Sequence, residues 1–454
     1  MYSSMLRRTA ALAMFSVLTA FGSQEVLAWP ATIYAGSCGT PNQPTIQLAV
    51  NAVAVGGTVK VCPGTYPEQV LITRNVTLTG VQVGNADAAV ITSPSTGVVV
   101  NTSDLYQPPS FPVAAQILVQ NAKAVNISNI TVDGSGNQLN SCATDIRGIY
   151  YQNASGTISE VATRNQVLAA GLTGCQAGQG IFVQSSYSGP GYNTASANVT
   201  IKNSSVHNFQ KNGITIDGPK ANGTVTFNSI TGQGPTTGAG ENGVQISDGA
   251  AGCVTDNAIV DNIWAPDVFG DTGDAAAGIL IYGSEHILVQ NNIVGTTQFG
   301  IVTVTDPVYG SSAVNPQGLG DHATITSNVV INTQLYDAID ICSNDNSITG
   351  NTVFNAAESG IHLDSTCGST GLGNTVSNNT VNESCAGILY GTGSPSGLAA
   401  HNSFFNVVSV VSAGDVCTPP PAPLAVTAAV PLFSAASSAA GSGSAGSAHP
   451  RPVQ

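Results

Sequence analysis

The phrase Gly213-Ile214-Thr215-Ile216 decides the fold, because it returns along much of the chain. Its apolar side chains alternate with others, which is typical of a β-strand with one buried face. The copies of this first phrase are Gly213–Ile216, Gly243–Ile246, Gly278–Ile281, Gly300–Thr303, Ala338–Ile341, Gly360–Leu363 and Gly387–Tyr390. A strand with this pattern must bury its apolar side against the copies that follow it.

A second phrase, Thr226-Phe227-Asn228-Ser229-Ile230, is interleaved with the first, and similar phrases begin at Thr255, Thr326, Thr349 and Ser377. Two strand phrases in each period of roughly 22 to 38 residues predict a solenoid of stacked coils. Since neighbouring strands lie about 4.8 Å apart, equivalent side chains should form ladders. We expect the Asn of the second phrase to turn a corner, because Asn tolerates a left-handed backbone. A β-sandwich of hairpins is the alternative, but the Asn-Gly dipeptides here introduce strands at a fixed point of the period.

The N-terminal part adds two features. Thr45 to Val53 is predicted to form a short amphipathic helix, and Gly64-Thr65-Tyr66-Pro67-Glu68 follows it. With the repeats, these features resemble the pectate-lyase-like superfamily over about residues 31–410. The resemblance implies an all-β, right-handed parallel β-helix with a short N-terminal capping helix. The superfamily includes lyases, hydrolases, esterases, epimerases and inert scaffolds, so the resemblance does not fix an activity.

Charged residues make up only 8% of the 454 residues, and the formal net charge is -14. This charge argues against nucleic acids and anionic membranes as partners. Residues 1–28 are typical of a signal peptide, with Arg7 and Arg8 before an apolar run, so we expect a secreted or periplasmic protein. We expect a β-helix domain over residues 29–416 and a Pro/Ala/Ser/Gly-rich tail over 417–454, either flexible or folded over the C-terminal end through its apolar stretch from Leu424 to Phe433. No transmembrane segment is expected in the mature chain, which we expect to be a monomer.

All nine cysteines follow residue 28. In an exported protein they are expected to be oxidised. Cys38 and Cys62 flank the predicted helix, and their disulfide would fix the cap to the first coil. Further plausible pairs, which would leave Cys253 unpaired, are Cys142 with Cys175, Cys342 with Cys367, and Cys385 with Cys417. The cysteine and histidine spacings do not suggest a metal site.

Alignment of the first phrases places the residue after each inward Ile or Val on one outward stripe. In late coils this stripe carries Asp340 and His362, and Asp364 lies two residues after His362. Asp340, His362 and Asp364 are the candidate catalytic residues, with His362 as a base oriented by one of the two carboxylates. Long insertions beside this stripe should wall a groove. Candidate substrate-binding residues there are Gln245, Trp264, Tyr282 and Tyr336.

The complete motifs of pectin methylesterases, polygalacturonases and pectate lyases are not present in this sequence. No cofactor is certain, although Asp267, Asp271 and Asp274 could bind calcium. Two function classes stay open. One is an exported protein that binds or processes an extracellular polysaccharide or cell-surface glycan, as a lyase, epimerase or glycoside hydrolase if it is catalytic. The other is a non-catalytic surface or periplasmic scaffold or adhesin.

Overall fold

The computed structural model describes most of the chain between residues 29 and 417. The described residues are 29–83, 86–105, 111–172, 174–186, 196–236, 240–264, 276–305, 319–365, 369–391, 397–414 and 416–417. The predicted signal peptide, the tail from residue 418 and the three aspartates proposed for calcium lie outside them. Within them, no helix has the length and apolar character needed to cross a membrane.

One sheet takes one strand from nearly every coil. In the described part of the chain it has 13 strands. They are β1 (Thr32–Ala35), β2 (Asn42–Gln43), β3 (Thr58–Val61), β6 (Val76–Gly80), β10 (Val125–Ser128), β13 (Gly156–Ser159), β16 (Ala197–Lys202), β19 (Ala221–Thr226), β22 (Ala251–Thr255), β25 (Leu288–Gln290), β28 (Thr324–Thr326), β31 (Ser347–Thr349) and β33 (Thr375–Ser377). All of the pairs recorded between these strands are parallel, for example Val254 opposite Val289.

The remaining strands form two parallel strips, which join at the C-terminal end. The strip that contains the second phrase consists of β4 (Gly64–Pro67), β7 (Ala89–Thr92), β11 (Thr131–Asp133), β14 (Ala162–Gln166), β17 (Ser205–Phe209), β20 (Ser229–Thr236), β23 (Ala258–Trp264), β26 (Ile293–Gly295) and β29 (Val329–Thr333). The strip that contains the first phrase consists of β5 (Val70–Ile72), β9 (Pro112–Gln120), β12 (Asp145–Gln152), β15 (Gln179–Gln184), β18 (Asn212–Asp217), β21 (Asn242–Ser247), β24 (Ala277–Tyr282), β27 (Phe299–Val304) and β30 (Ile339–Cys342).

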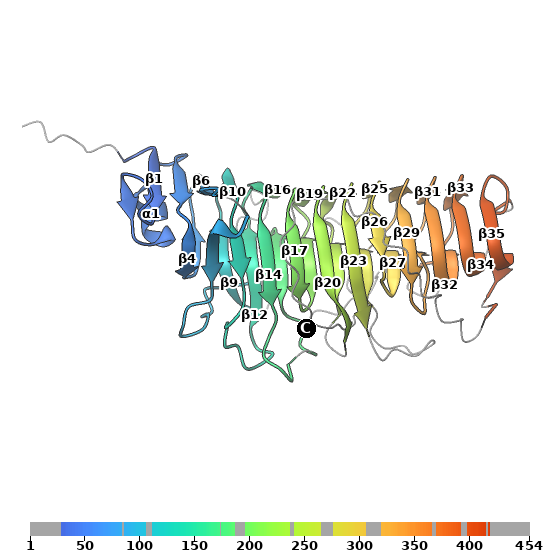
Figure 1. Cartoon of the computed structure of the whole chain (residues 1–454). Helices are drawn as coiled ribbons and strands as arrows, with labels where there is room; N and C mark the ends of the chain where they lie inside the picture. Colours follow the sequence, from blue (N-terminus) through green and yellow to red (C-terminus); the bar gives the residue numbers. More distant parts are fainter. Residues whose placement is uncertain are drawn as a thin grey trace, which may run out of the picture.

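Three long strands continue through both strips: β32 (Thr352–Leu363), β34 (Thr380–Tyr390) and β35 (Ser403–Ala413). The short β8 (Thr102–Ser103) is antiparallel to β9. Figure 1 shows the result, an elongated stack with α1 (Ile46–Ala52) at one end and β35 at the other. The topology is that of a parallel β-helix, as the sequence predicts.

The predicted inward ladder forms the core. Each member lies opposite the next in register and is fully buried: Ile149, Ile181, Ile214, Val244, Ile279, Ile301, Ile339, Ile361 and Ile388. The glycine that opens the first phrase permits this close stacking. A Cβ atom on Gly213 would lie 2.6 Å from the carbonyl oxygen of Gly243 in the next coil.

The asparagines of the second phrase form a buried ladder. Asn257 donates from its backbone N and from Nδ2 to Oδ1 of Asn292, at 3.1 and 3.0 Å, and Asn292 binds Asn328 in the same way. The expectation that these residues adopt the left-handed backbone is wrong. The residue just before each of them does so, for example Asp256 and Asn291. The preceding residue turns the corner, and the Asn side chain then points into the stack, where its amide joins successive coils.

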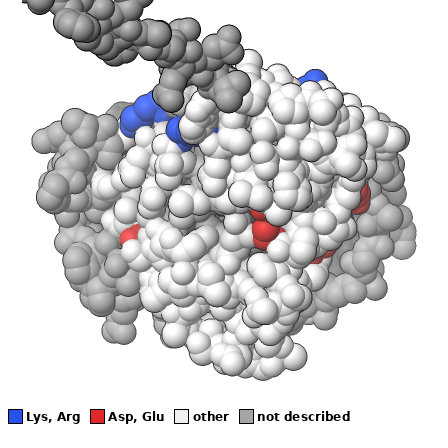
Figure 2. All heavy atoms as spheres, turned by 90° about the vertical axis from the view of Figure 1, so that its left-hand side faces the viewer, with Lys and Arg blue, Asp and Glu red and all other residues white. Residues whose placement is uncertain are grey.

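The N-terminal cap follows the prediction, with a helix over Ile46–Ala52. The carboxylate of Glu68 accepts hydrogen bonds from the first two helical backbone N–H groups, at 2.8 and 2.9 Å. Tyr66 donates from its hydroxyl to backbone carbonyl groups on both sides of the cap. Tyr66 and Glu68 of the Gly-Thr-Tyr-x-Glu phrase therefore attach the helix to the first coil. Seen from this end, the surface is mostly uncharged (Figure 2).

Three expected disulfides are present: Cys38–Cys62, Cys142–Cys175 and Cys385–Cys417. Cys253 is a free, half-buried cysteine, as expected. Cys342 is disulfide-bonded. Its expected partner, Cys367, lies outside the described residues.

Candidate functional site

The outward side of the strip that carries the first phrase is called the outer face here. Strand pairing places Asp340 on β30 directly opposite His362 on β32. Their neighbours Ile339 and Ile361 point into the core, so the two polar side chains point outward. Asp364 follows β32 immediately, and Asp337 lies two residues before β30. The elements thus gather four titratable side chains at the C-terminal part of the outer face.

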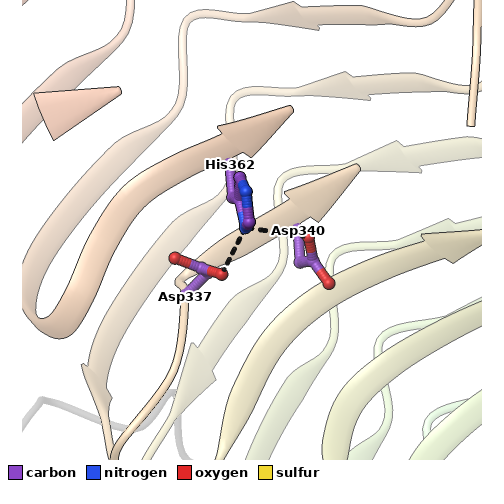
Figure 3. A group of neighbouring side chains, drawn as sticks. All are labelled: Asp337, Asp340 and His362. Carbon is purple, nitrogen blue, oxygen red and sulfur yellow. Dashed lines mark hydrogen bonds and ion pairs between the residues drawn. The ribbon is translucent and has the colours of Figure 1, made fainter. Parts of the chain in front are cut away.

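The imidazole of His362 lies between two carboxyl groups (Figure 3). Its Nδ1 is 3.0 Å from Oδ2 of Asp337 and 3.7 Å from Oδ1 of Asp340. The Oγ of Ser359 donates a 2.5 Å hydrogen bond to the other oxygen of Asp337 and so fixes that carboxylate. The side chain of His362 is 19% exposed, whereas those of Asp337 and Asp340 are 3% and 8% exposed. His362 is therefore the member most accessible from outside.

The charges of this group change its proton affinities. Burial alone would lower the pKa of His362, but the charge of Asp337 and its hydrogen bond, with Asp340 and Asp364, outweigh that effect and raise the pKa to about 10. Burial, followed by the charges of Asp337 and Asp364, holds the pKa of Asp340 well above its usual range, although His362 acts in the opposite direction. Near neutral pH the imidazole is thus protonated, and the raised pKa of Asp340 shifts that carboxyl group towards its neutral form.

In this arrangement His362 can donate a proton through its second ring nitrogen. Asp337 occupies Nδ1, and Nε2 has no hydrogen-bond partner among the described residues. An imidazole held by a carboxylate on one nitrogen can exchange a proton through the other. The sequence-based hypothesis assigned the orienting role to Asp340 or Asp364 and made His362 a base. In the structure the carboxylate hydrogen-bonded to His362 is that of Asp337, and Asp340 lies 3.7 Å from the same nitrogen.

Asp337 was missed because it lies before the strand phrase, at the corner, and only residues after the inward Ile were considered. One signal was available in the sequence. The same register position carries polar side chains in other coils, including Asn212 and Asn242. A search of that position would have found a carboxylate one coil from His362.

Asp364 joins the group from the other side of Asp340. The sulfur of Cys342 lies 3.7 Å from Oδ2 of Asp340 and 3.3 Å from Oδ2 of Asp364. The structure therefore brings together all three residues predicted to be catalytic.

Of the four predicted substrate-binding residues, Tyr336 alone lies beside this cluster. Its ring stacks on Phe299, with centroids 4.5 Å apart and planes 4° from parallel, and both residues are half-buried. Phe299 occupies the coil before Asp337, and Tyr336 immediately precedes Asp337. Phe299 was not predicted.

The other three predicted substrate-binding residues lie further along the stack. Tyr282 is buried in an outward apolar cluster with Leu280 and Val302. Gln245 hydrogen-bonds Asn212, Asn242 and Ser247, within a polar part of the outer face. Trp264 ends β23, where its backbone N–H donates to Gln298.

Two groups of possible metal ligands share Asp340. In each group the ligand atoms lie within 4.8 Å of one another: Asp337, Asp340 and His362 in one, and Asp340, Cys342 and Asp364 in the other. The disulfide of Cys342 removes its thiolate, so the second group offers two carboxylates. The first group offers an imidazole nitrogen and two carboxylates, a set that suits a divalent transition metal better than calcium.

Comparison with known proteins identifies the architecture. The family described as "Right handed beta helix region" matches residues 192–405, which include the candidate site. The chain has the right-handed parallel β-helix fold that the resemblance in sequence implies. No curated protein matches this β-helix in sequence.

Several solved structures are similar to this chain. The N-terminal fragment of gene product 12 of bacteriophage Phi29 has 15% identity and a TM-score of 0.51, with 80% of this chain covered. A GH136 lacto-N-biosidase from Eubacterium ramulus has 11% identity and a TM-score of 0.51, and the match covers 84% of this chain and 67% of that one. ORF18 of Geobacillus virus E2 has 13% identity and a TM-score of 0.40, with 84% of this chain covered. This chain matches 60% of the length of ORF18 and 63% of the length of the Phi29 fragment. At such identities the likeness concerns the fold alone.

Proposed function

We propose that this protein is exported and binds an extracellular polysaccharide at the C-terminal part of its outer face, where His362 takes part in cleaving or modifying it. The observation that carries the proposal is the Asp337–His362 pair beside Asp340. A histidine oriented by a buried carboxylate, with its second nitrogen available, is a general acid or base rather than a simple surface charge.

The neighbouring aromatic pair supports a carbohydrate as the substrate. Phe299 and Tyr336 offer flat, half-buried rings next to Asp337, and such rings suit the apolar faces of sugars. One solved β-helix of similar fold is named a lacto-N-biosidase, which is consistent with a glycan as ligand. The three disulfides agree with an oxidising compartment.

The proposed chemistry begins with a proton from His362. In hydrolysis, Nε2 donates it to the glycosidic oxygen as the C–O bond breaks, and a carboxylate of the cluster takes a proton from the attacking water. In elimination, the same donor protonates the leaving oxygen while a carboxylate removes a proton from the sugar carbon. Both routes need one donor and one acceptor, and the cluster contains both. The products distinguish the routes, because elimination leaves an unsaturated sugar.

The test is a screen of the purified protein against neutral and anionic polysaccharides, with calcium and with a chelator. New reducing ends and absorbance of unsaturated sugars report hydrolysis and elimination. His362→Asn should reduce turnover by about 10²-fold or more. The matched control is His401→Asn, since His401 is an exposed histidine on a turn of the last coil.

Three outcomes would contradict the proposal in whole or in part. If His362→Asn retains full activity on a processed glycan, the chemistry occurs elsewhere. If no glycan in the panel is bound or turned over, the non-catalytic scaffold becomes the better interpretation. Binding without turnover would leave the glycan site and remove the catalytic role of His362.

A further inference from the structure

The two ends of the stack differ in how they are covered. At the N-terminal end α1 lies over the first coils and buries Ile46, Ala49 and Val50. At the C-terminal end the last strand, β35, pairs with β34 along its length, and no other described strand pairs with its second edge. An unpaired edge of this kind is a template for another chain unless something covers it.

The side chains of β35 are unusually apolar for an open end. Phe405, Val408 and Val410 are 56%, 70% and 44% exposed. The inward-pointing Phe404, Val407 and Val411 are only partly buried, because the coil below contacts them and no described coil lies above. The equivalent positions in interior coils, such as Val381 and Ile388, are completely buried. The end thus lacks one layer of apolar contacts.

The chain that follows β35 starts at this end. Cys417 forms a disulfide with Cys385 on β34, which fixes the start of the tail to the last coils. From residue 418 to 448 the tail has no charged or histidine side chain, and its most apolar stretch runs from Leu424 to Phe433. We propose that Leu424–Phe433 packs over β35 and supplies the missing layer.

The length of the connection fits this role. Six residues separate Cys417 from Leu424, and six extended residues span about 20 Å. Four of the six are prolines, which restrict the connection to extended conformations. A connection of this length lets the apolar stretch reach the end of the stack. Its valines and leucines match the exposed apolar side chains of β35, and neither surface has charges that would oppose the contact.

The test compares hydrogen exchange of the backbone amides of residues 403–413 in five proteins. They are the full chain, a chain truncated after Cys417, a chain truncated after Ser434, the double variant Val426→Asp with Val430→Asp, and the matched control Ala435→Asp with Ala439→Asp. The proposal predicts exchange about tenfold faster in the truncation after Cys417 and in the valine variant. The truncation after Ser434 and the alanine control should behave like the full chain.

A melting curve and sedimentation of each protein complete the experiment. The two proteins that lose the cover should melt at lower temperature and self-associate at high concentration. Equal exchange in all five proteins would overturn the proposal. The proposal would also be overturned if the protein were a dimer and the amides of β35 stayed protected from exchange after truncation at Cys417. A second copy of the chain would then be what covers β35. No glycan is used, so the result is independent of the function proposed for His362.

Discussion

The surroundings of His362 differ strongly from those of a free side chain. Two carboxyl oxygens, of Asp337 and Asp340, lie within 3.7 Å of its Nδ1, and the charge of Asp364 acts in the same direction. Its protonated form is therefore stabilised by folding. The same surroundings hold the neighbouring Asp340 closer to its neutral form. The cluster binds protons more tightly in the folded chain than its members do when unfolded.

This proton affinity predicts a pH dependence of stability. The pKa of His362 is about 10 in the folded chain and 6.5 for an ordinary histidine. The contribution of His362 to the free energy of unfolding is thus fully present below about pH 6.5 and is lost as the pH rises through about 10. In urea unfolding, the free energy of unfolding of the wild type should exceed that of His362→Asn by about 1–3 kcal/mol at pH 6. This difference should shrink steadily towards pH 10.

Wild type and His362→Asn must be compared because the ionisation of buried tyrosines also destabilises the folded protein at high pH. Burial raises the pKa of Tyr151, so its ionisation favours unfolding in both proteins. His401→Asn, a substitution at an exposed histidine, provides the control. If the difference in free energy of unfolding between wild type and His362→Asn is constant from pH 6 to pH 10, the raised pKa assigned to His362 is wrong.

Asp337 should control the proton of His362 directly. In Asp337→Asn the hydrogen bond loses its charge, so the pKa of His362 should fall from about 10 towards 6.5. NMR titration of the imidazole measures this change. Asp364→Asn is the matched control, because Asp364 contributes least among the three carboxyl groups and should move the pKa less. A larger effect from Asp364 than from Asp337 would show that the orienting residue has been misassigned.

Among the elements, the corners of the second strip contribute a continuous line of amides. Each buried Asn satisfies a backbone N–H and a backbone carbonyl of the preceding coil. For Asn292 the partners are the backbone N–H of Asn257, at 3.1 Å, and the carbonyl of Val254, at 2.8 Å. Loss of one amide therefore removes partners from backbone groups of the preceding coil and breaks the link to the next Asn of the ladder. The ladder links the coils beyond their strand pairing.

Asn292→Ala should consequently be costly. It removes a fully buried amide and leaves the N–H of Asn257 unsatisfied, which should destabilise the protein by about 2–4 kcal/mol in urea unfolding. The neighbouring Asn291 has a left-handed backbone and an exposed side chain, so Asn291→Gly keeps the corner and should be nearly neutral. Equal losses in both variants would show that the corner, not the ladder, matters.

The sequence predicts the strands well and the corners less well. Alternation fixes which side chains of Gly-Ile-x-Ile face inward, and coil stacking then places Asp340 opposite His362. Neither rule applies at a corner, where the chain leaves strand geometry. This explains both errors: the left-handed residue is the one before the ladder Asn, and Asp337 was overlooked. Phe299 was also missed, because its contact with Tyr336 depends on how two coils pack at the same corner.

For the whole molecule, the net charge of -14 should affect which glycans bind. A polyanion approaching the protein is repelled at low ionic strength, and added salt screens this repulsion over about 10 Å at 0.1 M. Binding of an anionic polysaccharide should therefore strengthen when NaCl is raised from about 10 to 200 mM. Binding of a neutral polysaccharide should stay the same. Calorimetry at the two salt concentrations measures both, and weaker anionic binding at high salt would indicate a local basic site.

The disulfides near both ends determine where the stack can open first. In a linear array of repeats, terminal units have one neighbour only, so melting ordinarily begins there. Here Cys38–Cys62 ties the cap to the first coil, and Cys385–Cys417 ties the last coil to the one before it. Fraying from either terminus is hindered as long as both bonds are oxidised. A reducing environment would move the origin of unfolding from interior coils to the ends, so the redox state would decide which part of the protein a protease reaches first.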